Sequence, residues 1–188
     1  MFVGHYGVSL AAKKVAPSVS LATVFVAVQL LDVGWSLLVL LGVEKVRIVP
    51  GITATNPLDL YYMPYTHSLV AAVLSHWILD FLVHRPDLPL YGDSAKVGMG
   101  LWNFPASALA LEVAFLFGGL WLYFQTGAAR RTGLLIFAVL MVAIQGFVFF
   151  GPPPASDRAA ALTALAAYAV FAAIIALLER RNDSPAPR

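Results

Sequence analysis

The chain has 188 residues, of which 60% are hydrophobic and only 12% are charged. Soluble domains are about 45–50% apolar and about 25% charged, so this composition excludes an ordinary soluble domain and predicts an integral membrane protein. A formal net charge of +2 without a basic run argues against nucleic-acid binding. The absence of cysteine excludes disulfides, cysteine metal ligands and a thiol nucleophile.

The N-terminal part predicts a short amphipathic helix followed by a first membrane span. Residues 1–15 carry His5 near their start, and they show no obvious small-residue cleavage site, so a standard signal peptide is not expected. Val19–Val43 is long enough to cross a hydrocarbon core of about 30 Å. Asp32 lies near the middle of this span, where a carboxyl group must be paired or protonated. It either joins a polar site or stays neutral and bonds to a neighbouring helix.

The rest of the chain predicts four more spans separated by polar connections. Glu44–Tyr62 is expected to be a polar connection and Tyr91–Gly100 a flexible loop, because both are rich in turn residues. The later spans are expected at Tyr65–Val83, Phe104–Phe124, Gly133–Phe150 and Ala159–Leu178. The prediction is therefore an all-α polytopic membrane protein with about five transmembrane helices. It is a single domain over residues 1–180, with the motifs in 1–112, packing helices in 133–178 and a flexible tail at 181–188.

The second predicted span carries an unusual set of ionisable side chains. The stretch from Met63 to Leu90 holds three of the four histidines, and His76, Asp80 and His84 follow one another at intervals of four. In a helix this spacing places all three on one face. Imidazole and carboxylate together suit zinc or another first-row divalent ion. The alternative is a helix end whose polar side chains reach the interface, and we consider it the better interpretation for His84.

Glu112 is a further carboxylate at the centre of a predicted span. Because it must find a donor, a cation or a proton, we expect it to face the bundle and to share a polar pocket with at least one motif residue. There it is a candidate general base. Ser68 and Ser75 each neighbour a histidine in sequence and so point elsewhere on a helix, which favours capping or helix–helix hydrogen bonds over a nucleophilic role.

Four short fragments follow one another in the first half of the chain. They are GHYGVSLA at the N-terminus, LLD at Asp32, YTHSL at His67 and SHWILD ending at Asp80. This ordered set resembles the YdjM-like family of bacterial inner-membrane proteins, which are labelled metal-dependent hydrolases. The resemblance implies a location in the bacterial inner membrane, a hydrolytic activity and a set of metal ligands: His5, Asp32, His67, His76 and Asp80.

The resemblance and the local spacing disagree about His67. In the family, a hydrophobic stretch long enough to cross and return usually separates the two histidine motifs, whereas only eight residues lie between His67 and His76 here. In an unbroken helix, nine steps of about 100° place these histidines on opposite faces, about 13 Å apart along the axis. We therefore expect His67 to lie to one side of the site, unless the helix breaks near Leu74 or His67 serves a different site.

Two main functions follow from these residues, and a third, plainer one stays open. The first is a membrane-embedded metal-dependent hydrolase with a divalent ion, zinc being expected, and a lipid-borne phosphoester or acyl ester as substrate. The second is a non-enzymatic protein that handles ions or protons along a relay of buried groups. The third is a scaffold in which polar residues only join helices. Clustered ligands favour the hydrolase, and groups strung across the membrane favour the relay.

Overall fold

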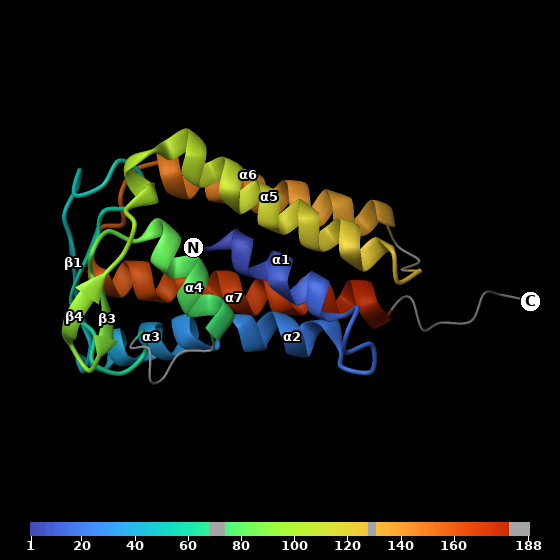
Figure 1. The fold of residues 1–188 in the computed structure, drawn as a ribbon, viewed down its shortest axis with the longest axis horizontal. Helices are drawn as coiled ribbons and strands as arrows, with labels where there is room; N and C mark the ends of the chain where they lie inside the picture. Colours follow the sequence, from blue (N-terminus) through green and yellow to red (C-terminus); the bar gives the residue numbers. More distant parts are fainter. Residues whose placement is uncertain (68–73, 128–130, 181–188) are drawn as a thin grey trace, which may run out of the picture.

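The computed structural model describes residues 1–67, 74–127 and 131–180, and the predicted tail at 181–188 lies outside them. Figure 1 shows helices lying along one another, with two β-hairpins at one end of the bundle. Three helices are long and apolar enough to cross a membrane. They are α5 (Pro105–Phe124), α6 (Arg131–Phe150) and α7 (Asp157–Arg180). The chain is therefore a helical integral membrane protein.

The predicted number of five spans is not what the structure contains. The first predicted span is divided into α2 (Leu21–Val28) and α3 (Leu30–Leu40), which bend by 52° at the break between them. In place of the predicted span Tyr65–Val83, α4 covers only Leu74–Val83, and residues 68–73 lie outside the described part. Ten residues extend about 15 Å, half of a hydrocarbon core. The described chain thus has three spans, or four if α2 and α3 form one.

The first helix, α1 (Val3–Ala12), is enclosed by the bundle and is not an amphipathic surface helix as predicted. Seven of its ten residues are buried. Two glycines allow it to approach α5 closely: a Cβ atom on Gly7 would lie 2.0 Å from the carbonyl oxygen of Phe115, and one on Gly119 would lie 1.9 Å from that of Gly7. Such small-residue contacts are typical of helices that pack within membranes. The close packing fixes His5 inside the bundle.

Both predicted connections contain a short β-hairpin. Strands β1 (Lys45–Ile48) and β2 (Leu58–Tyr62) pair antiparallel, as do β3 (Leu88–Tyr91) and β4 (Ser94–Val97). In the first hairpin, Val46 and Leu60 are buried against Trp35 of α3. This buried apolar face stabilises strands in a segment whose turn residues suggested only a polar connection. The hairpins cover the bundle end that follows α3 and α4 (Figure 1).

The main core lies between the helices, and the long helices also carry large apolar residues outward. Aromatic side chains from four helices meet in the largest cluster: Tyr6, Phe25, Phe137 and Phe171. On the outer surface of α5 and α6, Trp121, Ile136 and Phe147 are each more than 60% exposed. Apolar residues on both the inside and the outside of a bundle are typical of helices surrounded by lipid.

Candidate metal centre

Four ionisable side chains from three separate segments meet in the middle of the bundle. Asp32 comes from α3, His67 from the bend before the undescribed residues, and His76 and Asp80 from α4. One ligand atom of each lies within 4.8 Å of every other. The two histidines and Asp80 are buried, whereas the side chain of Asp32 keeps 14% of its surface exposed. We call these four residues the centre.

The distances within the centre fit a tetrahedral ion. His67 Nε2 lies 3.2 Å from Asp32 Oδ1 and 3.4 Å from Asp80 Oδ2. His76 Nε2 lies 3.4 Å and 3.0 Å from the same two oxygens. A tetrahedron around an ion with bonds of about 2.0–2.1 Å has edges of about 3.3–3.4 Å, so four of its six edges are already at or near their lengths.

The helix break beside α3 fixes the orientation of His76. Its Nδ1 lies 2.8 Å from the carbonyl oxygen of Val28, the last residue of α2, where a helix leaves its carbonyl groups without intrahelical partners. Because a carbonyl can only accept, Nδ1 carries the proton and Nε2 is directed at the carboxylates. The buried Nε2 nevertheless has no hydrogen-bond partner in the described part of the chain. An imidazole oriented in this way is typical of a metal ligand.

A second chain of hydrogen bonds orients His67. Thr66 donates its hydroxyl proton to Glu44 Oε2 over 2.6 Å, so its oxygen accepts from His67 Nδ1 at 3.1 Å. Glu44 is buried and also accepts the backbone N–H groups of Tyr65 and Thr66, each at 2.9 Å. These bonds hold the bend that carries His67. They also leave its Nε2 free to face the two aspartates.

Each aspartate uses one oxygen for the centre and the other for a donor outside it. Asp32 Oδ2 accepts a hydrogen bond of 3.2 Å from the Tyr168 hydroxyl on α7. Asp80 Oδ1 lies 3.1 Å from His5 Nε2 and also contacts the amino group of Met1. Asp32 Oδ1 and Asp80 Oδ2 therefore point inward at the imidazole nitrogens. Four groups that can all act as acceptors then face one another and require a positive charge between them.

His5 lies beside the centre without joining its four-atom group. Its ring stacks on that of His76, with centroids 3.9 Å apart and an interplanar angle of 4°. Both rings belong to helices too short to span the membrane. Burial, together with the charge on His76, lowers the pKa of His5 to about 4, so this ring is neutral. Burial also acts to lower the pKa of His76, but the charges of Asp80 and Asp32 outweigh it and raise that pKa to about 10.

Glu112 faces the bundle, as predicted, and binds the start of α1. It accepts the backbone N–H of Gly4 at 2.8 Å and that of Phe2 at 3.1 and 3.2 Å, and it accepts Gln145 Nε2 at 3.2 Å. The first N–H groups of a helix have no intrahelical partner, and α1 has no side-chain cap of its own. Glu112 thus supplies the missing cap and fixes the helix that holds His5. Its predicted role as general base stays a prediction.

The prediction that His67 lies to one side is wrong. The rings of His67 and His76 are 5.5 Å apart, and both histidines face the same two aspartates. The error came from treating Tyr65–Val83 as one helix, which would put the two histidines on opposite faces. The bend at Thr66 and His67 removes that constraint. The expected approach of His76 and Asp80 to Asp32 and His5 is confirmed.

Residues around the centre were missed because nothing in the sequence marks them. Glu44 lies in a polar connection, Tyr168 in an alanine-rich helix, and Val28 contributes only a backbone carbonyl. Thr66 had a sequence signal, since it directly precedes a candidate ligand, but we interpreted it as a helix cap. A polar residue next to a candidate ligand deserves consideration as its hydrogen-bond partner.

Comparisons of the chain with protein-family models, with curated proteins and with solved structures found no match. The resemblance to the YdjM-like family therefore stays a prediction. The chemistry of the centre is inferred from its own residues. Two imidazoles and two carboxylates, oriented by outer hydrogen bonds, are compatible with a bound divalent ion.

Proposed function

We propose that this protein is a metal-dependent hydrolase of the bacterial inner membrane that cleaves an ester bond of a lipid-borne substrate. The observation that carries the proposal is the convergence of His67 Nε2, His76 Nε2 and two carboxylate oxygens at distances of 3.0–3.4 Å. Zinc suits this ligand set best, because it accepts nitrogen and oxygen ligands in a tetrahedron. A bound divalent ion would polarise a phosphoryl or acyl oxygen and activate water near neutral pH.

The arrangement of the polar residues supports an enzyme more than a relay. A relay needs ionisable groups strung across the membrane, whereas these four residues form one compact group. The partial exposure of Asp32 offers an approach to the otherwise buried ligands. Because the centre lies among apolar helices, a substrate carried by a membrane lipid fits it better than a soluble one. Phosphoester and acyl ester bonds both suit this chemistry.

Metal analysis tests the proposal first. Detergent-purified wild type, loaded with zinc and then freed of excess ion, is expected to retain about one ion per chain, and His76→Ala is expected to retain almost none. Asp93→Asn is a matched control, since Asp93 lies in the second hairpin and pairs with Lys96. Wild-type protein that holds no more zinc than His76→Ala would contradict the proposal.

Hydrolysis is tested separately with two chromogenic probes in detergent, bis(para-nitrophenyl) phosphate and para-nitrophenyl butyrate. The zinc-loaded wild type is expected to cleave one of them, and His76→Ala neither. A zinc-loaded wild type inert toward both probes and toward phospholipids in mixed micelles would overturn the hydrolase assignment while leaving the metal centre intact.

A further inference from the structure

A second histidine–aspartate pair lies beside the centre, at the end of α4. His84 directly follows α4 and lies one turn beyond Asp80 on the face that carries both α4 ligands. Its ring lies 6.3 Å from the ring of His67 and 4.2 Å from that of Trp102, measured between centroids. His84 and its partner Asp87 are both buried. The pair therefore stands between the centre and the hairpin end of the bundle.

Asp87 fixes the tautomer of His84. His84 Nδ1 lies 2.9 Å from Asp87 Oδ1, and an ionised carboxylate can only accept, so Nδ1 carries the proton. The remaining nitrogen, Nε2, then has an available lone pair, and no hydrogen bond to it occurs among the described residues. A histidine oriented by an aspartate through one nitrogen, with the other nitrogen open, is the arrangement of a general base.

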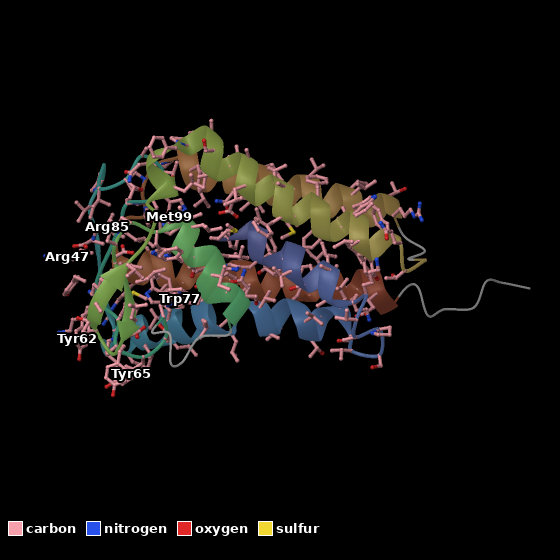
Figure 2. All side chains as sticks on the ribbon, in the orientation of Figure 1. Arg47, Tyr62, Tyr65, Trp77, Arg85 and Met99 are labelled. Carbon is pink, nitrogen blue, oxygen red and sulfur yellow. The ribbon has the colours of Figure 1, made fainter. Side chains whose placement is uncertain are left out.

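The surrounding backbone and charges keep this pair rigid. The N–H of Gly100 donates to the His84 carbonyl over 2.6 Å, which ties the end of α4 to the segment before α5. Arg85 Nε lies 3.2 Å from Asp87 Oδ2, and the same guanidinium pairs with Asp59 on β2. Figure 2 shows Arg85 at the hairpin end, beside Met99. Asp87 is thus held as a carboxylate by a permanent cation.

We propose that His84 is the general base of the hydrolysis and that Asp87 is its positioning residue. This inference rests on the proposed hydrolase function. His84 Nε2 takes a proton from a water molecule as the water oxygen forms a bond to the ester phosphorus or acyl carbon. The bond from that atom to the ester oxygen breaks, and His84 Nε2 gives the proton to the departing oxygen. The products are an alcohol and an acid, and the imidazole returns to its initial state.

His84 suits this role better than the other candidate, Glu112. The oxygens of Glu112 already accept the N–H groups that begin α1 and the Gln145 amide. His84 has an open nitrogen, and its ring adjoins a ligand of the centre at a separation that one water molecule bridges. The two assignments differ in which side chain can accept a proton without breaking a helix cap.

Three proteins test the inference: wild type, His84→Gln and Asp87→Asn, each loaded with zinc in detergent. His84→Gln is expected to retain its zinc and to lose about 10²–10⁴-fold in the rate of the probe that wild type cleaves. Asp87→Asn is expected to lose about 10-fold or more with zinc unchanged. Asp93→Asn is the matched control, because it neutralises another ion-paired aspartate of the same bundle end, and it is expected to keep the wild-type rate.

Histidine side-chain nitrogen NMR supplies a readout that does not depend on activity. In wild type, His84 is expected to carry its proton on Nδ1, and in Asp87→Asn the proton is expected to move toward Nε2. This second variant also decides the matter if His84→Gln does not fold. A wild-type rate in zinc-loaded His84→Gln, loss of zinc from that variant, or an Nε2-protonated His84 in wild type would each overturn the inference. A zinc-loaded wild type that is itself inert would instead refute the proposed function.

Discussion

Two polar clusters of this protein contain the same kinds of residues and differ in how their charges are balanced. At the hairpin end, Asp59 accepts Arg47 at 2.6 Å and also Arg85, and Asp87 lies against Arg85 and His84. Figure 2 shows Arg47 and Arg85 together at this end of the bundle. Every carboxylate there faces a donor that is permanently charged or fixed by a carboxylate.

The centre lacks such a balance. Its inward carboxylate oxygens face His67 and His76, whose Nδ1 protons are already donated elsewhere. Since unpaired charge is costly away from water, the centre must take up protons or a cation. The comparison teaches that a cluster of acids and histidines indicates a metal site only when its own side chains leave it without donors. The hairpin cluster fails that test and serves structure and positioning.

The largest expected effect comes from removing an inward oxygen. Asp80→Asn replaces one charged ligand by a neutral amide while keeping the shape of the side chain, so zinc affinity is expected to fall by more than about 100-fold. Competition with a chromophoric chelator measures it. Asp59→Asn is the control from the hairpin cluster and should keep the wild-type affinity. Equal losses in both variants would remove the distinction between the clusters.

Metal removal should destabilise the folded protein through the centre alone. Saturating zinc at about 100 times its dissociation constant stabilises a folded state by about 2.7 kcal/mol. Treatment of the zinc-loaded wild type with a chelator is therefore expected to lower its thermal unfolding temperature in detergent. Asp80→Asn should show no change on the same treatment. A similar decrease in both proteins would mean that the stabilising ion binds elsewhere.

A smaller effect is expected from the hydrogen bonds that orient His67. Thr66→Val removes the acceptor of Nδ1 and should weaken zinc binding by about 10- to 100-fold, the usual range for partners of metal ligands. Thr66→Ser keeps the hydroxyl and is expected to restore affinity. If valine and serine bind zinc equally well, the path from Glu44 to His67 does not orient the ligand.

The smallest effect should come from the hairpin cluster itself. Arg85→Gln leaves Asp59 paired with Arg47, and the Arg85 side chain is 30% exposed, so the free energy of unfolding is expected to fall by only about 1 kcal/mol. Zinc content should not change. Zinc loss in this variant would show that the two clusters are coupled.

The sequence predicted the helical membrane class and named all four residues of the centre, because composition and i,i+4 spacing are local signals. It did not predict the break at Gln29 or the bend at Thr66 and His67, since apolar residues continue through both. Those two interruptions supply the carbonyl that orients His76 and bring His67 to the centre. The outer residues Glu44 and Tyr168 depend on tertiary packing, which no local pattern encodes.

X-ray absorption spectroscopy of the zinc-loaded protein tests the central claim most directly. The centre predicts four nitrogen or oxygen ligands at about 2.0–2.1 Å, two of them imidazoles with their outer-ring scattering. His76→Ala, at the same total zinc, should lose one imidazole from any ion that stays bound. A wild-type spectrum without imidazole scattering, or one unchanged by His76→Ala, would contradict the assignment of the metal to this centre.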